Sequence, residues 1–195
     1  ESTVYPGATR EILANTIENV SGLRAGEDFY VGYSPERMVP GDSEHGIRDV
    51  VKIVSGENDV IRSELAELYG IIVDAGVHEA PEIEVAEAAK AIENIQRDVN
   101  IALMNELAIA CQSIGLVTHD VLEAARTKWN FHDYQPGLVG GHCIPVDPFF
   151  MIYESERNGY TPKLIEQSRD INEYMPTYIA DLTLRGLNDC KKVLR

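Results

Sequence analysis

A chain of 195 residues, 44% hydrophobic and 25% charged, is long enough to bury a core and too apolar to be disordered. Its net charge of −15 argues against nucleic acid or an anionic membrane surface as partner, although a few local cations or helix N-termini can still bind an anionic small ligand. Three widely spaced cysteines favour a reducing cytoplasm over a disulfide framework, and no apolar run approaches the roughly 18 residues of a membrane span.

The first 80 residues predict a layered α/β unit. Residues 1–4 have the pattern of a strand and follow no initiator methionine, so we expect the chain to be a piece of something longer. The pattern then predicts a helix over 8–20, strands over 29–33 and 50–54, a helix over 57–72 and an extended piece over 73–80. Alternating strands and helices favour a sheet covered by helices. The ligand edge of such a sheet lies beyond the carboxyl ends of its strands, where Thr3 and Glu36 fall.

Residues 81–195 predict a mainly helical unit. The run from residue 83 to 114 contains no proline or glycine and is rich in Ala, Glu, Ile and Leu, which predicts one long helix. Further helices are expected over 119–127, 149–157 and 162–195, with a kink or break at Pro176. We therefore expect an α/β chain divided at residues 80 and 81, whose longest helix could serve as a subunit interface.

Lys90 and Asn94 form a candidate pair on that long helix. They are four residues apart, so their side chains stand on one face, one turn from each other. A lysine on a helix is normally solvated. Here the alanines at 86, 88, 89 and 91 predict close packing, which would leave Lys90 little open solvent.

A glycine-rich loop, Tyr134–Pro148, is the most conspicuous stretch of the chain. Its glycines allow positive φ and the close approach of a ligand, and its prolines stiffen the two ends. The three glycines that could serve a ligand in this way are Gly137, Gly140 and Gly141. A flexible linker would not combine these features, so the loop is a candidate site.

Cys143 lies at the centre of this loop. Asp147 followed by Pro148 predicts a helix start, with the carboxylate at the N-cap and the proline at the first helical position. Cys143 would then lie close to a helix N-terminus, where the dipole favours the thiolate that a cysteine nucleophile needs. Two other interpretations are a small buried cysteine in an ordinary turn and a metal site. A metal site would use His132, His142, Cys143 and Asp147, but their spacing does not match structural zinc sites.

Five segments, in this order, resemble the UDP-glucose/GDP-mannose dehydrogenase family. They are residues 1–8 (ESTVYPGA), 34–37 (SPER), 88–94 (AAKAIEN), 105–108 (NELA) and 140–147 (GGHCIPVD). The resemblance runs the whole length of the chain. The loop that contains Cys143 is most similar to the branch that oxidises UDP-N-acetylhexosamines for capsule and O-antigen sugars.

The resemblance implies an NAD-dependent oxidation of a sugar primary alcohol to a carboxylate. The family carries it out in two successive hydride transfers, through a covalent thioester on a cysteine, and Cys143 matches that nucleophile. Lys90 and Asn94 match the pair that stabilises the developing oxyanion. The implied fold is the C-terminal part of a Rossmann-like NAD-binding domain followed by a helical central domain through which the family forms homodimers.

The resemblance also assigns the surrounding polar residues. Glu36 matches the carboxylate linked to base chemistry and water activation, while Thr3 and Asp147 match polar residues around the water and the lysine. Thr3 and Cys143 are also expected beside NAD, and the loop from Tyr134 to Gly141 is expected to wrap the UDP-sugar. The expected substrate-binding residues are Glu36, Arg37, Met38, Lys90, Asn94, Tyr134, Gly137, Gly140 and Gly141.

Some features depart from the family pattern. No G-x-G-x-x-G turn occurs in the 195 residues, and the family's carboxyl-terminal domain would follow Arg195. We therefore expect the chain alone to bind NAD poorly and to turn over little substrate. Val146 and Arg37 stand where glucose-oxidising relatives tend to have lysine and an aromatic residue, which argues against glucose as the sugar.

Two competing functions remain open from the sequence. The first is an oligomerisation module that acts only through its long helix. The second is a cysteine hydrolase that pairs Cys143 with a histidine, although no histidine and acid partner can be assigned.

Overall fold

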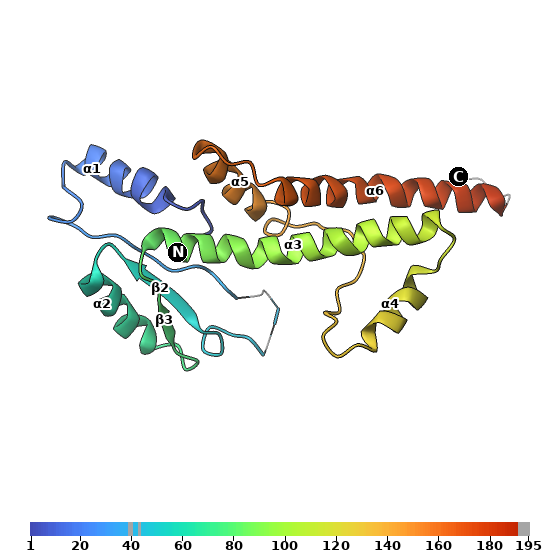
Figure 1. Cartoon of the computed structure of the whole chain (residues 1–195). Coiled ribbons are helices and arrows are strands. Elements are labelled where there is room, and N and C mark those ends of the chain that lie inside the picture. Colours follow the sequence, from blue (N-terminus) through green and yellow to red (C-terminus); the bar gives the residue numbers. More distant parts are fainter. Residues whose placement is uncertain (39–40, 43, 191–195) are drawn as a thin grey trace. The chain divides into compact units, whose positions relative to one another are not determined.

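The computed structural model describes residues 1–38, 41–42 and 44–190 (Figure 1). It divides into two compact units. The first contains Glu1–Asn94 and Phe149–Tyr160, and the second contains Ile95–Pro148 and Thr161–Arg195. The helix α3 (Ile83–Ser113) supplies residues to both units, and so does α5 (Asp147–Arg157).

A three-stranded sheet organises the first unit. The strand β2 (Lys52–Gly56) lies in the middle, antiparallel to β1 (Gly32–Tyr33) and parallel to β3 (Val77–Glu79). Every residue of β2 is buried. The helix α2 (Asp59–Gly70) follows β2 so closely that a Cβ added to Gly56 would lie 2.4 Å from the amide nitrogen of Arg62. Only glycine fits at this turn.

The apolar core of the first unit joins the sheet to the beginning of α3. Val31, Tyr33 and Ile53 from the sheet region meet Ile83 and Ala86 from the first turn of α3. The π-helix η1 (Thr9–Ala14) adds its last residue to the same cluster and continues as α1 (Asn15–Ser21). The first turns of α3 are thus fixed to the sheet by burial of apolar surface.

Several expectations for the first unit need correction. Residues 1–4 pair with no strand in the part of the chain that the structure describes, because the observed sheet contains only β1, β2 and β3. The strand expected over 29–33 is limited to its last two residues, and the one expected over 50–54 begins two residues later. The helix expected over 8–20 is present, but its first half is a π-helix. As expected, it ends where Gly22 takes a left-handed conformation, with φ of 75°.

Helices make up the second unit. The helix α6 (Lys163–Asp189) packs along α3, with Asn172 and Arg169 of α6 hydrogen-bonded to Asp98 of α3, and α4 (Thr118–Arg126) precedes the glycine-rich loop. A kink or break was expected at Pro176, and the break does not occur: α6 continues through the proline, with the preceding Met175 buried. Packing offsets the single hydrogen bond that the proline cannot donate. No helix of the described residues is long and apolar enough to cross a bilayer.

Candidate active site

Lys90 and Asn94 lie on the part of α3 that belongs to the first unit. Asn94 is 5% exposed and Lys90 is half-buried, beside the fully buried Ala86 and Ala91. This confirms the close packing expected from the small neighbours. Among the described residues, the Lys90 ammonium has no hydrogen-bond or ion-pair partner. A half-buried cation without a protein counter-charge can bind an anionic ligand or a developing oxyanion.

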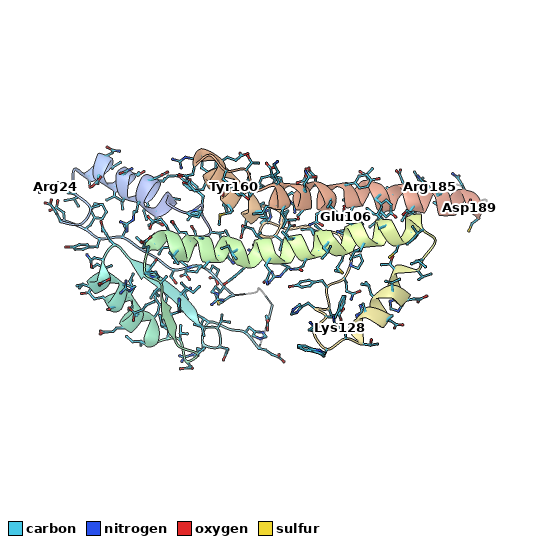
Figure 2. All side chains as sticks on the ribbon, viewed as in Figure 1. Arg24, Glu106, Lys128, Tyr160, Arg185 and Asp189 are labelled. Carbon is cyan, nitrogen blue, oxygen red and sulfur yellow. The ribbon has the colours of Figure 1, made fainter. Side chains whose placement is uncertain are left out.

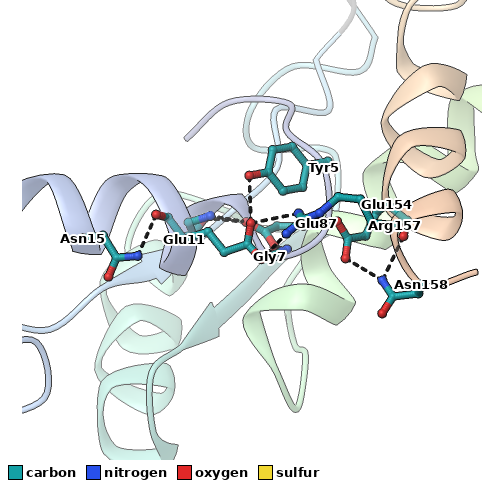
Figure 3. Close-up of polar contacts among 9 residues, drawn as sticks. Tyr5, Gly7, Glu11, Asn15, Glu87, Glu154, Arg157 and Asn158 are labelled. Atoms are coloured by element: carbon teal, nitrogen blue, oxygen red, sulfur yellow. Dashed lines mark hydrogen bonds and ion pairs between the residues drawn. The ribbon is translucent and has the colours of Figure 1, made fainter.

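Glu87, one turn before Lys90, ties this helix to the segment that follows Thr3. Its side chain is completely buried, and it accepts hydrogen bonds from Gly7 N at 2.6 Å and from Thr9 N at 2.9 Å (Figure 3). It also accepts one from Thr9 Oγ1 at 2.5 Å. A carboxylate that accepts the amides at the beginning of η1 stabilises that helix start and fixes it to α3.

The same segment is also held from its exposed side. Arg157 of α5 donates to Glu11 Oε2 at 3.0 Å (Figure 3). The rings of Tyr5 and Tyr153 pack edge to face with centroids 5.1 Å apart. The Arg157 guanidinium, followed by the Tyr5 hydroxyl, lowers the pKa of the Glu11 carboxyl. Burial, and then the hydrogen bond to Glu11, raises the pKa of Tyr5. Thr3 itself is half-buried.

Side chains on both sides of Glu36 fix the SPER segment. The Ser34 hydroxyl donates to the Ile53 carbonyl in β2 at 2.6 Å. Arg37 donates to the Val51 carbonyl at 2.6 Å and forms an ion pair with Glu93 of α3 at 2.8 Å. Since Glu93 lies between Lys90 and Asn94 in sequence, this ion pair connects the segment to the lysine-bearing helix.

Glu36 itself is half-buried, and one of its carboxylate oxygens accepts the Met38 amide at 2.6 Å. This bond orients the carboxylate within its own turn. Met38 is exposed and lines a shallow surface pocket together with Glu36 and Arg37. Residues 39, 40 and 43, further along this segment, lie outside the described residues.

Cys143 has an exposed thiol in the second unit. Its carbonyl accepts the amides of Val146 at 3.1 Å and Asp147 at 2.9 Å, and α5 begins at Asp147. The helix therefore begins one residue earlier than predicted, with Asp147 as its first residue rather than its N-cap, and the cysteine lies one turn before it. Asp147 is 2% exposed. An exposed thiol in this position is accessible to an electrophilic carbon.

The glycines of the loop differ from the expectation in part. Only Gly141 of the three takes a positive φ, of 89°. Gly137 and Gly140 do not, so the left-handed conformation that glycine allows is used only at Gly141. A Cβ added at any of the three would meet no atom within 4 Å, so none of them is enforced by packing. Tyr134 is half-buried.

Asn105 holds this loop in a way that the sequence did not reveal. Its side chain hydrogen-bonds both the N–H and the C=O of Gly137. The resemblance to the family points to the NELA segment without giving Asn105 a role, and it does not include Glu87. The signal for both was a polar residue at a position that the apolar spacing of α3 assigns to a buried face.

The expected site residues fall into two groups, one in each unit. The first unit carries Thr3, Glu36, Arg37, Met38, Lys90 and Asn94, which the contacts of Glu87 and Glu93 connect to one helix. The second unit carries Tyr134, Gly137, Gly140, Gly141, Cys143 and Asp147. Within the described part of the chain, no group of three or more His, Cys, Asp or Glu side chains could hold a metal ion, so the metal interpretation has no ligand set.

The comparisons with known proteins decide the family. The model of the UDP-glucose/GDP-mannose dehydrogenase family's NAD-binding domain matches residues 1–73, and the model of its central domain matches residues 84–174. The chain belongs to the UDP-glucose/GDP-mannose dehydrogenase family. Its fold is part of a Rossmann-type domain followed by a helical central domain, as the sequence predicted. The boundary expected at residues 80 and 81 stays a prediction.

Proteins with similar sequences match this chain over nearly its whole length. Protein CapL of Staphylococcus aureus is 51% identical over 187 residues, which are 96% of this chain and 44% of CapL. UDP-N-acetyl-D-glucosamine 6-dehydrogenase of Pseudomonas aeruginosa is 50% identical with the same coverage. The solved structure of UDP-D-ManNAc dehydrogenase from Pyrococcus horikoshii superimposes with a TM-score of 0.87 at 35% identity, over 98% of this chain and 45% of that one. The chain thus spans less than half the length of these relatives.

The first unit has a small cavity near its N-terminal residues. A cavity of about 230 Å³ in the first unit is lined by the backbone segment on both sides of Thr3, by η1 and by Tyr33. It is smaller than the roughly 300–1,000 Å³ of pockets that enclose a drug-sized ligand. The glycine-rich turn that would bind the pyrophosphate does not occur in this sequence.

Proposed function

We propose that this chain is the central part of an NAD-dependent dehydrogenase that oxidises the C6 alcohol of a UDP-N-acetylhexosamine to the carboxylic acid. The observation that carries the proposal is the 50% identity, over 96% of the chain, to a UDP-N-acetyl-D-glucosamine 6-dehydrogenase. The exposed thiol of Cys143 and the half-buried Lys90, which has no ion-pair partner among the described residues, supply the side chains that the reaction requires. The working compartment is the cytoplasm, in agreement with three free cysteines.

Each step has a candidate group in this chain. The Cys143 thiolate adds to the carbon of the sugar aldehyde, and the C–S bond that forms makes a thiohemiacetal, which becomes a thioester on oxidation. Lys90 and Asn94 stabilise the negative charge that develops on the oxygen. Glu36 and Asp147 are the candidate bases that take the proton of the alcohol and later of the water that breaks the C–S bond, and Thr3 is a candidate to orient that water. NAD, when bound, supplies the acceptor for two hydrides.

The second part of the proposal is a homodimer built on α3. Leu103 and Leu107 are exposed on one face of this helix, and the exposed Ile114 follows directly after its end. At about 100° per residue, the three side chains fall within an arc of about 40°. An exposed apolar stripe of this kind is typical of a subunit interface.

The reaction is tested by its stoichiometry in a complete protein that contains this chain. We expect about two NADH per UDP-N-acetylhexosamine and slower turnover of UDP-glucose. Cys143→Ser should abolish turnover, whereas Cys190→Ser, which changes another exposed free cysteine, should leave it intact. One NADH per sugar, or full activity of Cys143→Ser, would contradict the thioester route.

The oligomerisation module is the alternative function, and sedimentation of the same protein separates the two. Leu103→Glu combined with Leu107→Glu should dissociate the dimer, while Cys143→Ser and the exposed-site control Glu106→Ala should not. A dimer without NADH formation from any UDP-sugar would favour the module. We also expect the 195-residue chain alone to bind NAD poorly and to turn over little.

A further inference from the structure

The Asn105 side chain contacts Gly137 as a neighbouring strand would. Its Nδ2 donates to the Gly137 carbonyl at 3.0 Å, and its Oδ1 accepts from the Gly137 amide at 2.8 Å. Asn105 is completely buried. Both polar groups of one peptide position in the loop are therefore satisfied from the protein side. The side of Gly137 on which a Cβ would stand is open, since no atom lies within 4 Å of that point.

The orientation of the Asn105 amide is fixed by a buried polar network. Its Nδ2 also donates to Asn172 Oδ1 at 2.8 Å, so both of its amide protons are used. Asn172 in turn donates to the carbonyl oxygen of Asp98 at 3.0 Å and to its carboxylate at 2.8 Å. Arg169 donates to the same carboxylate at 2.6 Å. All four side chains, Asp98, Asn105, Arg169 and Asn172, are buried.

A rotated amide would place N–H groups against the Gly137 amide and an oxygen against Asn172 Oδ1. Three of the contacts above would then be lost inside the protein, where polar groups without partners are strongly penalised. The network therefore selects one orientation of Asn105, and that orientation sets the position of Gly137. The adjacent Glu106 is exposed (Figure 2), and within the described part of the chain its side chain makes no hydrogen bond to this network.

We infer that Asn105 is a positioning residue for the sugar nucleotide: through Gly137 it holds the loop from Tyr134 to Gly141 in the shape that binds the UDP-sugar. The inference rests on the proposed function and assigns the control of substrate affinity to a residue behind the loop. Cys143 has its own attachment, the turn that leads into α5, and Gly141 with positive φ lies between the two. Loss of the Asn105 contacts should therefore affect sugar binding more than thiol chemistry.

The test uses the complete protein with Asn105→Ala, Asn172→Ala and the neighbouring control Glu106→Ala. We expect Asn105→Ala to raise KM for UDP-N-acetylglucosamine about tenfold or more and to lower kcat less. Asn172→Ala removes only the hydrogen bond that fixes the Asn105 amide. Its KM should therefore lie between the values of Asn105→Ala and the wild type. The rate of Cys143 alkylation by iodoacetamide should stay within about threefold of the wild type in all three variants.

A merely structural role predicts a different result. If Asn105→Ala changes kcat, the alkylation rate and the melting temperature together, or leaves KM within about twofold of the wild type, the inference is wrong. Hydrogen exchange of the peptide over residues 134–141 adds a readout that does not depend on turnover. If the wild type forms no NADH, the proposed function fails. Equal exchange in wild type and Asn105→Ala would then also overturn the positioning role.

Discussion

Glu87 and Asn105 are both completely buried polar side chains of α3, and each holds the backbone of a loop that carries expected site residues. The loops present different groups to them. At the beginning of η1, two backbone amides and one hydroxyl require acceptors, and the Glu87 carboxylate can only accept. At Gly137, one amide and one carbonyl require an acceptor and a donor, which the Asn105 amide provides.

The difference shows how the local backbone selects the buried side chain. A helix start presents donors only, so a carboxylate suits it and an amide does not. An extended peptide presents one donor and one acceptor, so the amide suits it. Replacing either group by its isostere should therefore be costly although size and shape are kept, because buried polar groups left without partners are penalised.

The largest loss of stability is expected when the ion pair between Asp98 and Arg169, in the network behind Asn105, is broken. Asp98→Ala leaves the buried Arg169 guanidinium without its main partner and should cost about 3–5 kcal/mol of unfolding free energy. Denaturant unfolding measures the loss. The double variant Asp98→Leu with Arg169→Met removes both charges and should be closer to the wild type. If the single variant were no less stable than the double one, the ion pair would not support the network.

Glu87→Gln should be the next most costly change. The new NH2 group faces backbone donors, so at least one buried N–H loses its acceptor, at a cost of roughly 1–3 kcal/mol. Hydrogen exchange at Gly7 and Thr9 should report the local opening. Glu84→Gln, on the same helix but paired with Arg10 near the surface, is the matched control and should change stability by less than about 1 kcal/mol. Equal losses of stability in the two variants would show that the buried acceptor Glu87 matters no more than the surface pair of Glu84.

Thr9→Val tests one of the three donors to Glu87, the Thr9 hydroxyl. It keeps the shape of the side chain and removes the hydroxyl that donates to Glu87, while the backbone bond of Thr9 remains. We expect a loss of about 1 kcal/mol in unfolding free energy. A loss as large as that of Glu87→Gln would show that the hydroxyl, not the backbone amides, dominates the contact.

The exposed pair of Glu11 and Arg157 should give the smallest and most pH-dependent effect. Because the pKa of Glu11 is lowered from its usual value of 4.5, its ionised form stabilises the folded state above that pH, and the contribution is lost as the pH falls through the lowered pKa. The melting-temperature difference between wild type and Glu11→Gln should therefore be small at neutral pH and vanish in acid. A difference that grows in acid would contradict the assignment.

Local sequence patterns predicted the elements that local interactions form. The absence of glycine and proline predicted α3 almost to its ends, and Asp147 with Pro148 predicted the start of α5. Burial of Lys90 followed from its small neighbours. The prediction of a break at Pro176 was wrong because α6 packs against α3, which stabilises the helix across the proline. This contact joins residues far apart in sequence, so no local pattern shows it.

Contacts between distant segments could not be predicted in the same way. Glu87 lies 80 residues from Gly7, and Asn105 lies 32 residues from Gly137, so neither partner is visible in a local pattern. Residues 1–4 have the composition of a strand, yet strand formation requires a neighbour to exchange hydrogen bonds with. Such non-local pairings fix where the candidate site residues stand, and they come only from the folded structure.

The amide of Asn105 also has no proton that titrates in the range where proteins are folded. Neither partner in its two bonds to Gly137 can gain or lose a proton in that range. The Asn105 contact therefore holds the loop in the same way while the reaction itself transfers protons. Any pH dependence of substrate affinity must originate in groups other than this contact.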